Sequence, residues 1–306
     1  MLFTTETALN PPFIDLHTHR RNTASGVVAV SNFSQKDFEN RQNTEGSFDF
    51  GCRIPDVGEA LPKSQILNPK SKNTEGSLLA SVGLHPWFLT KENFENDFRK
   101  ITQLVDNQNI MAIGECGLDK LRGEDLAFQT VAFEAQIRLA ESVSKPVLIH
   151  CVRAFNEVIA VKRRLNPTIP LIIHGFNKNV NVLNELLRHG FFISIGAAIL
   201  TQNSKHFTQN VQNTEGSSNF GFRLSAVGDA LPKSEIKNST SNDASSFAKN
   251  LLNIPLDRLF FETDDAENVA ISTIYETAAT ILAKDVNDLK SIVYANFERH
   301  FQQFQI

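Results

Sequence analysis

The stretch that decides the fold is FIDLHTH, at Phe13–His19. Its residues alternate in character, with Ile14 and Leu16 on one side of the pattern and His17 and His19 on the other. Successive side chains of a β-strand point to opposite faces, so we expect the two histidines to emerge side by side at the end of a strand. Such a pair is suited to hold a divalent metal ion, but an isolated pair is more often two surface histidines.

Seven further apolar segments follow and alternate with amphipathic ones. We expect strands at Phe13–Leu16, Val27–Val30, Leu79–Leu84, Ile110–Gly114, Pro146–Ile149, Leu171–Ile173, Phe191–Ile195 and Leu259–Glu262. We expect helices at Phe94–Asp106, Asp125–Val143 (apolar stripe Phe128, Val131, Ala135, Leu139), Ala154–Leu165, Val180–His189, Ser245–Leu252 and Ile271–Ala283. Continuous apolar strands are typical of parallel sheets covered on both faces. The pattern predicts a (β/α)8 TIM barrel, with a doubly wound open sheet as the alternative.

Composition excludes several classes of protein. The hydrophobic share of 41% is that of a globular protein, and a net charge of −4 with a pI of about 6.1 argues against a broad basic surface for duplex nucleic acid. The three cysteines do not make a disulfide framework. The chain has neither a targeting pattern at its N-terminus nor an apolar run long enough to span a membrane. We therefore expect a cytoplasmic protein without membrane contact, and take it to be a monomer.

Two similar segments interrupt the strand and helix pattern. Gln42–Ile66 and Gln212–Ile236 match at about two positions in three, and a third NTEGS lies at Asn73–Ser77. Both are rich in Gly, Pro, Asn and Ser, which indicates loop insertions at 42–77 and 212–245 rather than a paired recognition module. Without them the chain is close to the roughly 250 residues of one barrel. We therefore predict a single domain over residues 1–306.

Metal-ligating residue types recur where the expected strands end. Five of the eight histidines lie just after such a strand, and two carboxylates do so as well. Active sites of (β/α)8 barrels lie at the carboxyl ends of the strands, so these side chains should meet. Six of them make a mixed imidazole and carboxylate set that suits two divalent ions sharing a carboxylate: His17, His19, Glu115, His150, His174 and Asp264.

The other candidates have structural explanations beside the functional ones. His85, before Pro86, either bonds to backbone at a turn or faces the substrate. Arg153 either grips a phosphate or forms a surface ion pair. Asp119 either caps the following helix or orients a ligand. Asp264 is the strongest catalytic candidate, because a carboxylate beside a metal can take a proton from water.

Six motifs in a fixed order resemble one known family. They are IDLHTH (14–19), SVGLHPW (81–87), IGECGLD (113–119), VLIHC (147–151), IIHGF (172–176) and FFETD (260–264). Together they resemble the TatD family of metal-dependent deoxyribonucleases, which belong to the amidohydrolase-like barrels. The resemblance covers nearly the whole chain except the two expected insertions.

The resemblance implies a function for each motif residue. The six ligands named above would form the family's two-metal site, with Mg, Mn or Zn as the candidate ions. Glu115 would bridge the ions, and Asp264 would act as ligand and general base. The implied reaction is hydrolysis of phosphodiester bonds at the 3′ end of DNA, single-stranded DNA included, with His85 and Arg153 on the substrate side.

The sequence departs from the family pattern at two places. The family commonly continues after ETD with a small residue, Pro and an aromatic, whereas this chain has Asp265-Ala266-Glu267. The basic residue after His150 comes three positions later, as Arg153, instead of two. These changes leave the metal ligands untouched but affect substrate choice. Two alternatives therefore stay open: hydrolysis of a small amide, ester or lactone at the same site, and a non-enzymatic barrel whose insertions bind a partner.

Overall fold

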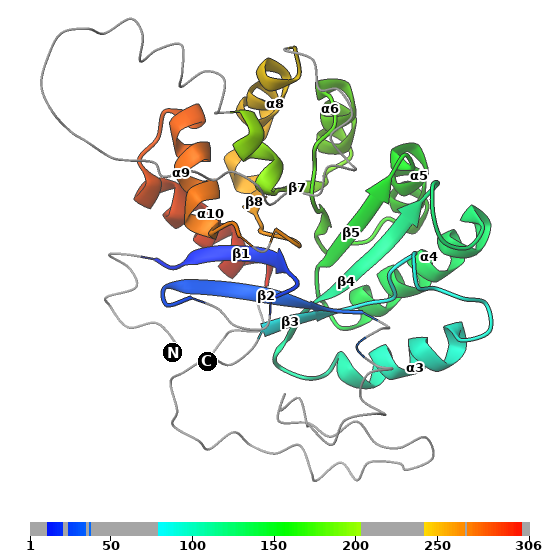
Figure 1. The fold of residues 1–306 in the computed structure, drawn as a ribbon. Coiled ribbons are helices and arrows are strands. Elements are labelled where there is room, and N and C mark those ends of the chain that lie inside the picture. The colour runs from blue at the N-terminus through cyan, green and yellow to red at the C-terminus, as the bar shows by residue number, and fades with distance from the viewer. Residues whose placement is uncertain are drawn as a thin grey trace, which may run out of the picture.

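The computed structural model describes residues 11–20, 24–34, 37, 79–202, 242–266 and 268–301. Eight parallel strands pair in chain order to form a nearly closed barrel, with helices outside it (Figure 1). The strands are β1 (Phe13–Thr18), β2 (Val27–Phe33), β3 (Leu79–Val82), β4 (Ile110–Asp119), β5 (Val147–Val152), β6 (Leu171–Ile173), β7 (Phe192–Ile195) and β8 (Leu259–Phe261). All eight expected strands are present. The predicted (β/α)8 barrel is confirmed, and the doubly wound alternative is wrong because every strand pairs with its neighbour in sequence.

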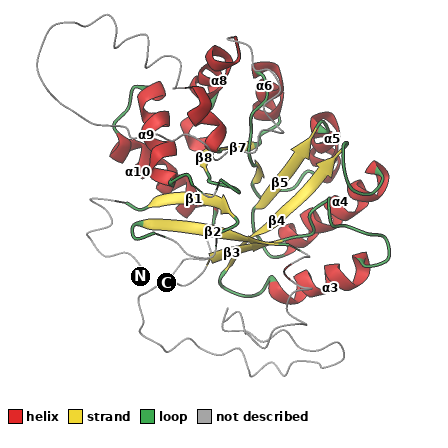
Figure 2. Cartoon of the chain, viewed as in Figure 1, coloured by secondary structure: helices red, strands yellow, loops and turns green. Residues whose placement is uncertain are grey.

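The expected helices are also present (Figure 2). They are α3 (Phe94–Leu104), α4 (Leu126–Ser142), α5 (Phe155–Leu165), α6 (Val180–Arg188), α8 (Asn242–Asn253) and α9 (Ile271–Leu282), followed by α10 (Val286–His300), which the sequence analysis missed. Two 3-10 turns, η2 (Ala197–Gln202) and η3 (Leu256–Arg258), precede α8 and β8. Among these described helices, none combines the length and apolar character needed to cross a bilayer.

The two expected insertions fall almost wholly outside the described residues. This holds for all of 42–77 and for residues 212–241 of the second segment. Residues 242–245 belong to the first turn of α8, so the helix begins three residues earlier than predicted. The single-domain assignment over 1–306 stays a prediction.

The buried face of α4 differs from the expected apolar stripe. Val131 is 58% exposed, and the residues that face the barrel are Gln129, Ala132, Phe133, Gln136, Ile137 and Ala140. Because two of the residues on the buried face are glutamines, the hydrophobicity of the sequence does not identify this face. Their amide groups bond to backbone at the ends of neighbouring strands, and that is why they are buried.

The connection between β1 and β2 is unusually short. Only residues 19–26 join these parallel strands, whereas such a crossover normally takes a dozen or more residues and contains a helix. A cavity of about 230 Å³ lies against these two strands and the start of α9, lined by residues that include Phe13, Val27 and Ile271. Within the part of the chain that the structure describes, the alternation of strands and helices is therefore broken at the first step of the barrel.

Side chains supply much of the closure between β1 and β8. Backbone pairing there is a single bridge between Thr18 and Asp264. The Asp15 carboxylate accepts hydrogen bonds from Thr263 N and Oγ1 at 2.8 and 2.7 Å. The hydroxyl of Tyr275, on α9, donates to Ile14 O at 3.1 Å and accepts from Ile14 N at 3.2 Å. This hydroxyl replaces the neighbouring strand that Ile14 lacks on that side.

We expect Tyr275→Phe to lower the free energy of unfolding by about 1–3 kcal/mol, because it leaves two buried backbone groups without a partner. Urea denaturation monitored by circular dichroism measures this change. Tyr294→Phe, on α10, is the matched control, because Tyr294 is only partly buried and its hydroxyl interacts with Glu298 on the same helix. Equal losses in the two variants would contradict a role of Tyr275 in closing the barrel.

Candidate metal centre

The predicted ligands converge at the carboxyl ends of their strands. Three of them lie inside a strand rather than after it: His17 in β1, Glu115 in β4 and His150 in β5. The expected strand ends were too early because parallel pairing continues past the ligands, in β4 as far as the pair Asp119 and Val152. Hydrogen bonding, rather than hydrophobicity, sets these boundaries.

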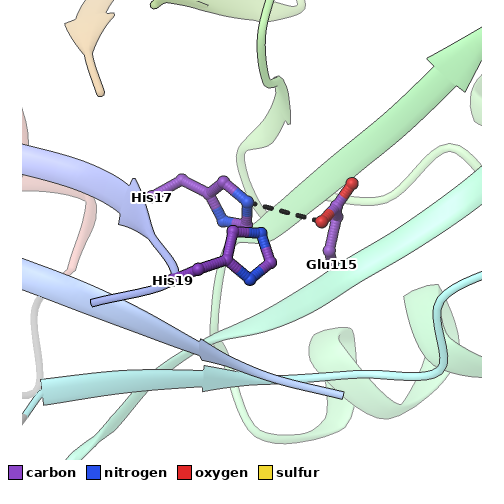
Figure 3. Close-up of side chains that lie close together, drawn as sticks. All are labelled: His17, His19 and Glu115. Atoms are coloured by element: carbon purple, nitrogen blue, oxygen red, sulfur yellow. Dashed lines mark ion pairs between the residues drawn. The ribbon is translucent and has the colours of Figure 1, made fainter. Parts of the chain in front are cut away.

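Irregular pairing occurs at two of the ligands. The register shifts between Asp15 and Thr18 in β1, and between Ile113 and Cys116 in β4. An irregularity of this kind bends a strand and redirects its side chains. His17 and Glu115 lie within the shifted segments, and both are buried. Figure 3 shows His17 and His19 at the end of β1 pointing toward Glu115, with His17 Nε2 3.4 Å from Glu115 Oε2.

Glu115 is the hub of the centre. Its Oε1 lies 2.8 Å from His150 Nδ1, 2.8 Å from His174 Nε2 and 3.1 Å from His85 Nε2. With His17 on the other oxygen, four imidazoles from four different strands or strand ends meet at one carboxylate. The backbone N–H of Glu115 donates to Asn32 Oδ1 at 2.9 Å, which ties this part of β4 to β2.

Asp264 forms the outer side of the centre. Its Oδ1 lies 3.5 Å from His17 Nε2 and 3.4 Å from His19 Nε2. The side chain is 34% exposed, as against 5% for Glu115, so Asp264 is the carboxylate that solvent and substrate can reach. Its backbone has φ of 52°, in the left-handed region; its N–H donates to His17 O and its carbonyl accepts from His19 N, on either side of Thr18 along one edge of β1.

Opposite charges in the centre hold Glu115 and His17 in their charged forms. Burial opposes ionisation of Glu115, but the charge of His174 and the hydrogen bond with His150 outweigh it and hold the pKa of Glu115 well below its usual range. Burial also opposes a charged His17, yet the carboxylates of Asp264 and Glu115 raise the pKa of His17 to about 10. Metal-ligating imidazole is neutral, so binding of a divalent ion would release the proton of His17.

The donor set fits divalent metal ions. Both ring nitrogens of His17 are buried, and neither makes a hydrogen bond of good geometry within the described structure. Donor atoms lie within 4.8 Å of one another in three groups: His17, His19 and Glu115; His17, His174 and Asp264; His85, Glu115 and His150. These groups contain all six predicted ligands and add His85. Mixed imidazole and carboxylate donors are those of catalytic sites for zinc, manganese or iron.

Two further carboxylates orient the histidines from behind. Asp119 Oδ2 lies 3.2 Å from His150 Nε2, which leaves Nδ1 of that ring for Glu115. Glu262 Oε1 lies 3.3 Å from His174 Nδ1, which leaves Nε2 for Glu115. A carboxylate behind a metal-binding histidine fixes the ring and raises its basicity. Sequence reasoning left the role of Asp119 open and missed Glu262, although Glu262 stands at the end of an expected strand.

We expect Glu262→Gln to weaken divalent metal binding about 10-fold to 100-fold, as is usual when the partner of a ligating histidine is changed. Glutamine keeps the volume, and its oxygen can still accept from Gly175 N, which Glu262 Oε1 does at 2.6 Å. Competition with a chelating dye measures the affinity. Glu157→Gln, on the α5 surface, removes the same charge at a position away from the His174 ring and should leave the metal affinity unchanged. Equal affinities for Glu262→Gln and wild type would contradict the orienting role.

Buried glutamines on α4 support the same region. Gln136 Oε1 accepts from Leu84 N at 2.7 Å, next to His85. Gln129 Oε1 accepts from Asp119 N at 2.8 Å, and its Nε2 donates to carbonyls of the loop that follows, Glu124 O among them at 2.7 Å. The sequence signal was a pair of glutamines seven residues apart, a spacing that places both on one face of a helix.

The two predicted substrate residues lie in different surroundings. His85 is 5% exposed and in contact with Glu115, so it joins the possible metal donors. Arg153 is exposed, with φ of 55°, one residue beyond the end of β5. A direct contact of either residue with substrate stays a prediction.

An eight-stranded parallel barrel with a histidine and carboxylate centre at its strand ends defines a class, the metal-centred (β/α)8 barrels. The family model described as TatD related DNase matches residues 14–218, more than half of the chain. The chain therefore belongs to the TatD related DNase family, as its six motifs predict.

Curated relatives match parts of the chain. A protein of Buchnera aphidicola, described as an uncharacterized metal-dependent hydrolase, is 30% identical over 131 residues, which are 42% of this chain and 49% of the relative. The 3′-5′ ssDNA/RNA exonuclease TatD of Edwardsiella piscicida is 36% identical over 118 residues, which are 38% of this chain and 45% of that one. The chain thus spans about half the length of these relatives.

Solved structures agree with the fold over nearly the whole chain. YjjV, a TatD homologue from Escherichia coli, superposes with a TM-score of 0.61 at 16% identity and covers 95% of this chain and 98% of its own. A TatD family hydrolase from Entamoeba histolytica gives a TM-score of 0.56 at 14% identity and covers 94% and 97%. At these identities the likeness establishes the fold alone.

Proposed function

We propose that this protein is a metal-dependent phosphodiesterase that releases nucleotides from the 3′ ends of single-stranded DNA. The observation that carries the proposal is the contact of four imidazoles with Glu115, beside the more exposed Asp264. Family membership and the names of the relatives, which include a 3′-5′ ssDNA/RNA exonuclease, support it.

The residues of the centre have distinct roles in this proposal. His17, His19, Glu115, His150, His174 and Asp264 would hold two divalent ions, with Mg, Mn and Zn as candidates. Ions bound there would supply Lewis-acid polarisation of the phosphodiester and a lower pKa for a water molecule. Asp264 accepts the proton of that water, because it is the carboxylate with access to solvent. Glu115, which is buried, keeps the imidazoles in place around it.

The substrate enters from the carboxyl ends of the strands. Arg153 binds a phosphate oxygen there, since a guanidinium provides paired donors for phosphate. His85 lines the same side of the centre. The protein acts on DNA as a cytoplasmic monomer without membrane contact.

The test is release of nucleotides from a 3′-labelled single-stranded DNA. Metal-loaded protein should release labelled nucleotide in Mg or Mn, and excess EDTA should stop the reaction. Bound metal is measured by elemental analysis on the same preparation. A preparation that carries metal and releases no nucleotide would contradict the proposal and direct attention to small amides, esters or lactones.

A further inference from the structure

The chain has a single tryptophan, and it lies beside the metal centre. The centroid of the Trp87 ring is 5.0 Å from that of His85 and 5.4 Å from that of His150, both at nearly perpendicular angles. Trp87 Nε1 donates to Asp119 Oδ2 at 2.6 Å, so the polar edge of the indole has a structural partner. Trp87 as a residue is nevertheless 38% exposed, which that hydrogen bond does not explain.

The loop after β4 carries Leu121 and Arg122, which together with Trp87 are called the platform. The guanidinium carbon of Arg122 lies 4.2 Å from the centroid of the Trp87 ring, and the adjacent Leu121 is 62% exposed. A planar cation and an indole thus lie together at the edge of the centre, and an exposed apolar residue adjoins the cation in sequence. Large exposed apolar groups near a site are typical of ligand contacts.

Backbone packing and buried hydrogen bonds fix the loops that carry this platform. A Cβ at Gly123 would lie 2.2 Å from Pro86 O, so the two loops touch backbone to backbone. The Gln129 amide donates to Arg122 O at 3.1 Å and to Asp119 O at 3.0 Å. The positions of Trp87 and Arg122 relative to the centre are therefore fixed by buried polar contacts.

We propose that Trp87, Leu121 and Arg122 bind the nucleobase next to the scissile phosphate by stacking. Aromatic side chains and arginine bind single-stranded nucleic acid in this way without regard to base identity. The inference rests on the proposed function, because a base reaches the platform only if a nucleic acid is bound at the metal centre. Stacking would contribute binding energy for the substrate, which a protein of net charge −4 does not gain from general attraction of phosphates.

Fluorescence of the single tryptophan tests stacking directly and without turnover. With metal bound, a single-stranded oligonucleotide with hydrolysis-resistant phosphorothioate linkages should quench the emission of Trp87, and the same backbone with abasic sugars should not. Quenching by both strands, or by neither, would overturn the proposal. Because this result does not depend on hydrolysis, it is independent of whether the nuclease activity is present.

Kinetics with matched variants separate stacking from the hydrogen bond to Asp119. Trp87→Phe and Trp87→Leu both remove the indole N–H, but only the second removes the aromatic face. On a normal oligonucleotide, Trp87→Leu should lower kcat/KM about 5-fold to 100-fold below Trp87→Phe. On a substrate with an abasic residue next to the scissile bond, the two variants should be equal. If Trp87→Leu and Trp87→Phe had equal kcat/KM on the normal oligonucleotide as well as on the abasic one, the proposal would be overturned.

The cation is tested with a second matched pair. Arg122→Gln should lower kcat/KM on the normal oligonucleotide, whereas Arg138→Gln, which removes an exposed arginine from the outer side of α4, should not. Equal effects of the two substitutions would remove Arg122 from the platform. A wild-type protein that loads metal, shows base-dependent quenching and cleaves no DNA would overturn the nuclease function alone.

Discussion

Asp264→Asn is expected to lower nucleotide release at least about 100-fold while leaving the fold intact, because the substitution removes the proton acceptor. Asparagine suits the position for a second reason. Asp264 has φ of 52° and closes the barrel through backbone bonds to His17 and His19. Asparagine is among the residues that adopt this left-handed conformation most readily, so the backbone bonds can persist. Single-turnover assays with 3′-labelled DNA measure the loss, and circular dichroism checks the fold.

Asp265→Asn is the matched control for this experiment. Asp265 is the next residue and is exposed, so the same change of charge occurs one position away from the centre. We expect wild-type rates for Asp265→Asn. Wild-type rates for Asp264→Asn would exclude Asp264 as the base.

Glu115→Gln should abolish the stabilisation that divalent metal gives to the protein. A ligand present at 100 times its dissociation constant stabilises a folded protein by about 2.7 kcal/mol, and an equivalent rise in melting temperature should be seen for the wild type. Glutamine fills the same space but lacks the charge that His17, His150 and His174 face. We therefore expect little or no rise with Mn or Zn for the variant, and activity near background.

The control for Glu115→Gln is Glu95→Gln, at an exposed position of α3. Its melting temperature should rise with metal as the wild type does. Differential scanning fluorimetry in EDTA and in metal compares the three proteins. A full metal-dependent rise for Glu115→Gln would contradict its place as the shared ligand.

Much of the fold and the site could be predicted because both depend on local patterns. The strands are short apolar runs, as at Leu171–Ile173, and parallel strands in a barrel bring their carboxyl ends together. Ligand residue types after several such runs therefore predict one centre. The structure brings the six predicted ligands together as expected, although their binding of metal stays a prediction.

The remaining features depend on partners that are distant in sequence. The ends of β4 and β5 are set by pairing between the strands, so the sequence placed Glu115 and His150 after strands that in fact contain them. Gln129 and Gln136 look like surface residues until the carbonyl and amide groups they bind are known. Glu262 is recognisable as an orienting residue only from its position behind His174. None of these contacts leaves a periodic signal.

The seam between β1 and β8 also decides when the centre can form during folding. The bonds that close it join residues 248 and 261 positions apart, among the longest separations the chain allows. Contacts between residues so far apart in sequence form slowly, after the local helices and strands have formed. His17 and His19 come from the first strand and Asp264 follows the eighth, so the metal centre is complete only when the two ends of the barrel have met. A chain that has been synthesised only in part contains the histidines but lacks Asp264. Hydrolytic activity is therefore expected only after the barrel has closed.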